Sequence, residues 1–237
     1  VEQLQGGIDT DLKSFPALAH MLFIIGTPPT DLPLATYRRW VDLWAEEQAA
    51  RIDFTMFFPS YPRYEGGKLR VGWASGAGFQ KSPGSSAIRG VFALHDRRTF
   101  EVHCFALKPD LRANDLRGNV SGSCDFFYEM GNIANDKDLA TLVNSHRPHV
   151  LIDVSGFSGD HRIKFLAHRP APLSFTFCEY PGTLGAAVGI DFIITDRIAS
   201  PPEFESIYSE KLLLVPPPYL PNDYRATVRV PTHAMGR

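Results

Sequence analysis

The chain has 237 residues, a formal net charge of −2, and 44% hydrophobic and 21% charged residues. This ordinary globular composition excludes general disorder, and the near-neutral charge excludes binding to nucleic acid or to a membrane surface by bulk electrostatics. The length suits one large domain, or one domain with an extension.

The first 60 residues are predicted to be a helical lead-in. Residues 12–25 are apolar enough for a buried helix, and a Pro-rich break follows at 27–33. Residues 35–52 form an amphipathic pattern, because apolar side chains recur at helical spacing: Tyr37, Trp40, Val41 and Trp44. We expect the face with Trp40 and Trp44 to be a packing surface for a partner. Residues 60–67 are predicted to be a linker because of their turn residues.

From residue 68 onward, short apolar runs alternate with helix-like stretches. The predicted strands are residues 69–74, 100–107, 126–129, 150–154, 173–178, 192–195 and 212–215, and the predicted helices are residues 85–94, 110–119, 137–146 and 162–168. This alternation predicts an α/β fold with a doubly wound, mostly parallel sheet. We place this domain at residues 68–226, with a tail at 227–237.

The cysteines and histidines indicate the compartment and argue against a metal. Cys104, Cys124 and Cys178 form no C-x-x-C pair and are too few for a disulfide framework, so we expect a reducing, intracellular setting. The sequence shows no signal-peptide pattern, and the apolar run at 21–25 is too short to span a bilayer. The histidines show no H-E-x-x-H or H-x-x-x-H spacing, so we expect no metal site.

Ligands of an open parallel sheet bind beyond the carboxyl ends of its strands, so the loops that follow strands are the candidate sites. The Gly-rich loop at 75–86 either cradles a phosphate or is a flexible turn capped by Ser85, and it matches neither phosphate-binding spacing. In the loop at 153–162, the run around Ser158 is one residue short of a nucleophile elbow, which favours an ordinary turn. In the loop at 178–185, Glu179 and Thr183 could meet a ligand, and Cys178 is either a reactive thiolate or an inert core residue.

Several segments together resemble one family. They are R-P-A-P at 169–172, Y-P-G-T-L-G at 180–185, D-F-I-I-T-D at 191–196 and Y-S-E-K at 208–211. In this order they resemble the protein O-GlcNAc transferase family, which includes the SPINDLY-like plant proteins, and L-R-V-G-W-A-S at 69–75 is similar to the opening strand of that family. The resemblance extends over roughly residues 10–228 and is strongest over 146–223.

The resemblance implies one Rossmann-like lobe of a GT-B glycosyltransferase. Such an enzyme moves N-acetylglucosamine from UDP-GlcNAc to Ser or Thr hydroxyls of proteins, with the sugar nucleotide as substrate and with no cofactor or metal. The implied partners are a protein or peptide acceptor and a second catalytic lobe or partner chain, with no nucleic acid and no membrane. The implied localisation is cytoplasmic or nuclear.

The resemblance also implies a binding site. The matched residues of the third loop are expected to line the sugar and acceptor site, with Lys81 beside them: Tyr180, Pro181, Gly182 and Thr183. The second lobe of the family supplies most of the sugar-nucleotide contacts, and the present chain resembles only the first, acceptor-side lobe. We therefore expect this chain alone to be inactive.

The sequence departs from the family at positions that matter for chemistry. The family pattern D-F-x-x-H-P-x-x-H, aligned on Phe79 and Pro83, places Ser82 and Ser86 where the family has histidines. A serine cannot act as a base near neutral pH without a partner, and Lys81 would need a depressed pKa to do so. At the third loop the family pattern is L-G-Y-P-G-T, so Cys178 and Glu179 stand where the family has Leu and Gly, and Glu179 puts a carboxylate where the sugar is expected to pack.

These departures leave the catalytic residues unknown and keep two other functions open. A degenerate, non-catalytic lobe could act as a binding or interaction module. A separate nucleotide-binding or hydrolase domain would depend only on the two loops at 75–86 and 153–162.

Overall fold

The computed structural model describes residues 33–50, 61–80, 82–110, 115–158 and 161–223. The predicted helix at 12–25 and the tail at 227–237 lie outside these residues. In the described part no helix is long and apolar enough to cross a membrane.

The centre of the fold is one seven-stranded sheet in the order β3-β2-β1-β4-β5-β6-β7. All the strand pairs are parallel. The strands are β1 (Leu69–Ser75), β2 (Phe100–Ala106), β3 (Phe126–Glu129), β4 (Val150–Asp153), β5 (Leu173–Phe177), β6 (Phe192–Thr195) and β7 (Lys211–Leu214). Every predicted strand is found within one residue at most of its bounds, and the doubly wound parallel sheet is confirmed.

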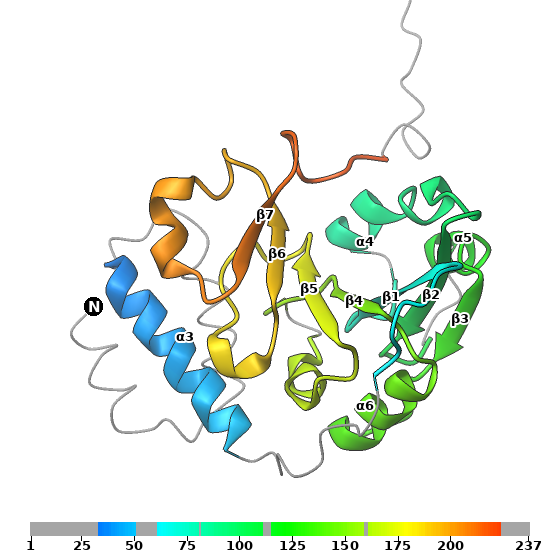
Figure 1. Ribbon diagram of the computed structural model, residues 1–237, viewed down its shortest axis with the longest axis horizontal. Helices are drawn as coiled ribbons and strands as arrows, with labels where there is room; N and C mark the ends of the chain where they lie inside the picture. Colours follow the sequence, from blue (N-terminus) through cyan, green and yellow to red (C-terminus); the bar gives the residue numbers. More distant parts are fainter. Residues whose placement is uncertain (1–32, 51–60, 81, 111–114, 159–160, 224–237) are drawn as a thin grey trace, which may run out of the picture.

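Helices and 3₁₀ turns connect and cover the strands (Figure 1). They are α3 (Leu34–Ala49), α4 (Pro83–Ile88), η2 (Phe92–Leu94), α5 (Asp115–Ser121), α6 (Asp136–Ser145), η3 (Ile163–His168), η4 (Ala186–Val188) and η5 (Pro202–Ile207). The predicted helix at 85–94 is wrong as one element, because the chain between Ile88 and Phe92 is not α-helical. Gly90, a poor helix former, lies there beside Asp223, which pairs with Arg89 at 2.7 Å.

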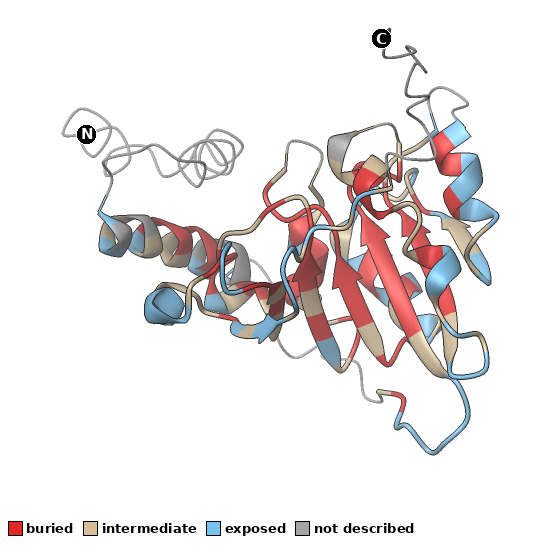
Figure 2. Ribbon diagram, turned by 90° about the horizontal axis from the view of Figure 1, so that it is seen from above, coloured by how far each residue is buried: buried red, intermediate tan, exposed pale blue. Residues whose placement is uncertain are grey.

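The core has one layer on each face of the sheet, and Figure 2 shows buried residues running along the central strands. On one face, α3, α6, η3 and η4 cover side chains that include Phe105 and Leu151. On the other face, α4, η2 and α5 cover side chains that include Trp73 and Val102. Burial on both faces explains why central strands such as β4 are short apolar runs without alternation.

Helix α3 packs onto the first of these layers. Trp40 and Trp44 are only 4% and 1% exposed, and Trp44 makes an edge-to-face contact with Phe157 at 4.8 Å. Gly185 has a left-handed φ of +90°, and a Cβ on it would lie 2.5 Å from the Cβ of Ala45. The prediction that the Trp40 and Trp44 face awaits a partner is therefore wrong, because this face completes the core of the lobe itself.

Candidate functional site

The strand order reverses between β1 and β4, since the chain runs outward from β1 to β3 and then returns to the other side of β1. At such a switch point the loops at the carboxyl ends diverge and leave a crevice for a ligand. Three loops meet there, in their described parts: residues 76–80 and 82 after β1, residues 154–158 and 161–162 after β4, and residues 178–185 after β5. These are the three loops that the sequence predicts as candidates.

Two serine hydroxyls fix the loop after β1. The backbone N–H of Gly76 donates to Ser155 Oγ at 2.9 Å, which ties this loop to the one after β4. The N–H of Phe79 donates to Ser75 Oγ at 3.1 Å, and the Phe79 side chain is fully buried. These two bonds hold the part of the loop between Gly76 and Phe79.

Ser82 joins the loop after β1 to the loop after β5. Its Oγ accepts from the N–H of Ser85 at 3.0 Å, so Ser82, and not the predicted Ser85, is the N-cap of α4. The same hydroxyl donates to Glu179 Oε1 at 3.0 Å, and Ser86 Oγ donates to the carbonyl of Ser82 at 2.7 Å. Two positions that depart from the family pattern, 82 and 179, therefore contact each other. Lys81 lies outside the described residues.

Replacing Ser82 by alanine is expected to lower the free energy of unfolding by about 1 kcal/mol, because the cap of α4 is lost. Urea denaturation measures this, and Ser86→Ala is the matched control, since it removes one hydroxyl from the same turn without removing the cap. The double variant with Glu179→Gln is expected to be non-additive. Equal effects of Ser82→Ala and Ser86→Ala would contradict the assigned cap.

A buried carboxyl lies at the end of β4, next to this bridge. Asp153 is 2% exposed and accepts from the N–H of Gly156 at 2.7 Å. Burial raises the pKa of Asp153 to about 7, and the charge of Glu179 contributes to the increase. Burial and, to a lesser degree, Glu179 also raise the pKa of the Cys178 thiol to about 12. Cys178 is 6% exposed, so it is the inert core thiol of the two alternatives.

The raised pKa of Asp153 predicts how the stability of the fold depends on pH. Its carboxyl keeps a proton in the folded state up to a pH of about 7, whereas an unfolded Asp loses it near 3.9, so the folded state binds more protons in between. Stability is therefore expected to fall as the pH rises, by as much as about 2 kcal/mol between about pH 5 and pH 7.5. Urea denaturation at the two pH values should show that Asp153→Asn flattens this dependence while Glu203→Gln, on an exposed carboxylate, does not. An unchanged slope in Asp153→Asn would refute the assignment.

The third loop is held from inside the lobe by Glu210. Thr183 Oγ1 donates to Glu210 Oε2 at 2.7 Å, and the N–H of Leu184 donates to Glu210 Oε1 at 2.8 Å. Thr183 and Glu210 are 1% and 3% exposed. The distance in sequence between them leaves no local pattern, so sequence reasoning missed this role of Glu210.

The four predicted residues of this loop divide into two pairs. Tyr180 is 2% exposed and contacts Phe157 edge to face, and Thr183 is buried against Glu210. Pro181 and Gly182 are half-buried, as are Ser82 and Glu179. At the carboxyl ends of the strands these loops therefore leave Pro181, Gly182, Ser82 and Glu179 partly accessible, whereas Tyr180 and Thr183 are buried and support the third loop.

The loop after β4 is built of turns. The N–H of Ser158 donates to the carbonyl of Ser155, and the N–H of His161 donates to the carbonyl of Ser158, both at 3.0 Å. These are the turns of the ordinary connection that the sequence favours over a nucleophile elbow.

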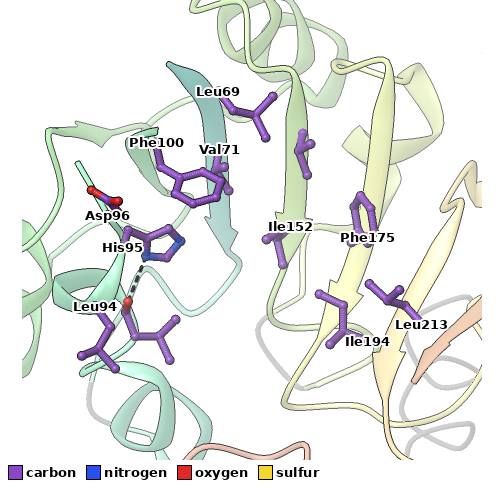
Figure 3. A pocket seen from close by; sticks show the side chains of 12 residues that line it. Leu69, Val71, Leu94, His95, Asp96, Phe100, Ile152, Phe175, Ile194 and Leu213 are labelled. Atoms are coloured by element: carbon purple, nitrogen blue, oxygen red, sulfur yellow. Dashed lines mark hydrogen bonds between the residues drawn. The ribbon is translucent and has the colours of Figure 1, made fainter. Parts of the chain in front are cut away.

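An apolar groove of about 700 Å³ lies on one face of the sheet, away from the crevice (Figure 3). It extends from Leu94 and His95 across Phe175 and Ile194 to Leu213. His95 Nδ1 bonds the carbonyl of Val91 at 2.9 Å, and burial lowers the pKa of His95. The lining is mostly hydrocarbon, so the groove offers little polar chemistry and has the character of a packing surface.

Two further features concern cysteine and metal chemistry. Cys104 and Cys124 form a disulfide, with Cα atoms 6.3 Å apart, although the sequence predicts no disulfide framework. Cys104 lies in β2 and Cys124 just before β3, so strand pairing brings together two residues that are distant in sequence.

Among the residues that the structure describes, no three His, Cys, Asp or Glu side chains gather in a way that could hold a metal ion.

Comparisons with known proteins agree with this architecture. A solved mutant O-GlcNAc transferase of Thermobaculum terrenum superposes with a TM-score of 0.76 over 91% of this chain and 42% of that one, at 23% identity. A probable UDP-N-acetylglucosamine–peptide N-acetylglucosaminyltransferase, SEC, of Arabidopsis thaliana is 34% identical over 166 residues, which is 68% of this chain and 16% of that protein. The corresponding UDP-N-acetylglucosamine–peptide N-acetylglucosaminyltransferase of Caenorhabditis elegans is 30% identical over 69% of this chain and 14% of that protein.

The chain thus spans less than a fifth of the length of these curated relatives, which are much longer proteins. The sequence model of glycosyl transferase family 41 matches residues 47–233 of this chain. This range includes β1–β7 and the three loops at the carboxyl ends of the strands. The fold, the order of the motifs and these matches together show that the chain belongs to glycosyl transferase family 41.

Proposed function

We propose that the chain is the acceptor-side lobe of a glycosyltransferase that moves N-acetylglucosamine from UDP-GlcNAc to Ser or Thr hydroxyls of proteins. The observation that carries this proposal is the contact between the loops after β1, β4 and β5, because the match to family 41 includes all three loops. The relatives in Arabidopsis thaliana and Caenorhabditis elegans are named as UDP-N-acetylglucosamine–peptide N-acetylglucosaminyltransferases, the former as a probable one, which supports the donor and the peptide acceptor.

The chemistry divides between this lobe and another part of the enzyme. Transfer needs an acceptor hydroxyl that attacks the sugar from the side opposite the leaving diphosphate, and it needs positive charge or helix dipoles to stabilise that leaving group. At the rim of the crevice, Ser82 and Glu179 present a hydroxyl and a carboxylate. A carboxylate suits an acceptor hydroxyl better than a diphosphate, so we assign the acceptor to this lobe and the diphosphate to a second catalytic lobe.

The proposal includes partners and a compartment. The acceptor is a protein or peptide, and the second lobe or a partner chain completes the site, without nucleic acid or a membrane. The donor is a substrate, and the reaction uses no further cofactor and no metal. We propose a cytoplasmic or nuclear location, where the proteins that carry Ser and Thr acceptors are accessible.

One observation favours the second candidate function, a non-catalytic binding module. The hydroxyl of Ser82 caps α4 and bonds Glu179, so the position where the family pattern has a histidine carries a structural hydroxyl and no base. In this case the lobe would still bind a Ser- or Thr-containing peptide but would not support transfer.

Transfer of radiolabelled N-acetylglucosamine to a Ser/Thr peptide tests the proposal, with this chain supplied in the presence and absence of a second lobe of the family. The proposal expects transfer only when both lobes are present. Peptide binding by calorimetry without any transfer would favour the binding module. Transfer by this chain alone would overturn the division of labour between the lobes.

The two departures at positions 82 and 179 offer a sharper version of the same assay. Ser82→His together with Glu179→Gly restores the family pattern at both ends of the contact. An increase in transfer by the double variant would show that the departures limit the chemistry of the crevice. A decrease would show that Ser82 and Glu179 themselves take part.

A further inference from the structure

Arg117 is a buried cation on α5 that lies against the loop after β1. Its side chain is 4% exposed, and its Nη1 donates to the carbonyl of Gly78 at 2.5 Å and to the carbonyl of Lys108 at 3.2 Å. One guanidinium group therefore joins the loop after β1 to the loop after β2. Charge-assisted bonds of this kind are stronger than neutral ones, and burial strengthens them further.

The orientation of Arg117 is fixed from β3. Its Nε donates to Glu129 Oε1 at 3.3 Å, and Nη2 pairs with the other carboxylate oxygen of Glu129. The guanidinium also lies over the ring of Phe127, 5.5 Å from the centroid. The loop is shaped to meet it, because a Cβ on Gly78 would lie 2.7 Å from the carbonyl oxygen of Lys108 and 2.8 Å from Arg117 Nη1.

The helix that carries Arg117 depends on tertiary contacts for its position. Helix α5 has only 7 residues, and isolated helices of this length are not stable in water. The disulfide between Cys104 and Cys124 fixes its end, since the N–H of Cys124 donates to the carbonyl of Val120 at 3.1 Å and Cys104 is a fully buried residue of β2. Contacts thus continue from the disulfide through α5 and Arg117 to Gly78.

We propose that the redox state of the Cys104–Cys124 pair controls how firmly the loop after β1 is held, and that Arg117 is the positioning residue that transmits this state. The proposal depends on the proposed function only because it places this loop beside the sugar-transfer crevice. Disulfides are rare in reducing compartments, and those that occur there are usually transient or redox-sensing, so in the proposed intracellular location this pair would be open to reduction.

The chemical step is thiol–disulfide exchange with a dithiol reductant. In the proposed step one thiolate of the reductant attacks Cys124 Sγ, because Cys124 is a half-buried residue whereas Cys104 is fully buried. The bond between the two cysteines breaks, and Cys104 leaves as a thiolate and takes up a proton. The second thiol of the reductant then displaces Cys124 and forms the reductant's own disulfide, so two electrons and two protons pass to the protein.

Hydrogen exchange followed by mass spectrometry tests the proposal, with the oxidised chain compared with the chain reduced by dithiothreitol. Four amides of the loop are bonded in the structure, those of Gly76, Gly78, Phe79 and Gln80. Reduction is expected to raise exchange in this loop and in α5 by at least about tenfold, and to leave β6 unchanged. Cys124→Ser in the absence of reductant should reproduce the reduced pattern and should no longer respond to dithiothreitol.

Variants of Arg117 test whether the redox state reaches the loop after β1 through Arg117 or whether reduction simply destabilises the whole sheet. Arg117→Met in the oxidised chain is expected to raise exchange in the loop, and subsequent reduction should then add little there. Arg117→Lys, which can still donate to the carbonyl of Gly78, should partly restore protection. Unchanged loop exchange on reduction, or increased exchange throughout the sheet including β6, would overturn the proposal. These readouts need no sugar transfer, so they remain decisive if the proposed function fails.

Discussion

Replacing Glu210 by alanine is expected to lower the free energy of unfolding by about 3 kcal/mol. The Glu210 carboxylate accepts from Thr183 Oγ1 and from the N–H of Leu184, and Ser209 Oγ lies 3.1 Å from its Oε2. Removal leaves the buried N–H of Leu184 without its acceptor, and the Thr183 hydroxyl, which is in a residue only 1% exposed, retains only Ser209 Oγ as a side-chain partner at 2.7 Å. Denaturation in urea measures the loss.

Two variants serve as matched controls for Glu210→Ala. Glu210→Gln retains an oxygen acceptor and is expected to lose less, whereas Glu205→Ala removes an exposed carboxylate of η5 and is expected to change stability by less than about 0.5 kcal/mol. A loss in Glu210→Ala no greater than that in Glu205→Ala would refute the view that Glu210 holds the Y-P-G-T loop.

Replacing Trp44 by alanine is expected to lower the free energy of unfolding by about 3–5 kcal/mol, because it leaves a large cavity. Trp44 is 1% exposed in the layer formed by α3, η3 and η4, and its ring meets that of Phe157 in the loop after β4. The same variant should therefore also loosen that loop, which hydrogen exchange at residues 155–158 would show.

Two control variants accompany Trp44→Ala, one that removes less of the same side chain and one that truncates an exposed apolar side chain. Trp44→Phe keeps an aromatic ring and is expected to lose less stability, and Leu94→Ala truncates an apolar side chain that is 83% exposed and is expected to be nearly neutral. If Trp44→Ala behaved like Leu94→Ala, α3 would not be part of the core of the lobe.

The strands of the sheet could be predicted from the sequence because each buried strand leaves a local signal, its own run of apolar residues. Strands buried on both faces leave short apolar runs between turn residues, and β4 and β6 are clear examples of such runs. Helix bounds and helix type follow less directly from the sequence, for a physical reason. At η3 the chain forms a 3₁₀ helix that ends at Arg169 in a left-handed conformation, with Pro170 directly after it, so packing and the proline decide its geometry.

The sequence could predict where the candidate site lies, but not which side chains contact one another within it. Loops that follow strands are recognisable, and the crevice follows from the strand order. The contacts that shape the crevice join distant residues, such as Ser82 with Glu179 and Thr183 with Glu210, and no spacing rule predicts them. The same holds for the Trp40 face, which has the pattern of an interaction surface but packs within the lobe.

The measurement that tests the account most directly is a hydrogen-exchange footprint of a Ser/Thr acceptor peptide on this chain. The account predicts protection of the loops after β1, β4 and β5, at residues 76–80, 155–158 and 178–184, with no change at Leu94 or Leu213 in the apolar groove. Protection confined to that groove, with the three loops unchanged, would contradict the assignment of the crevice as the acceptor site.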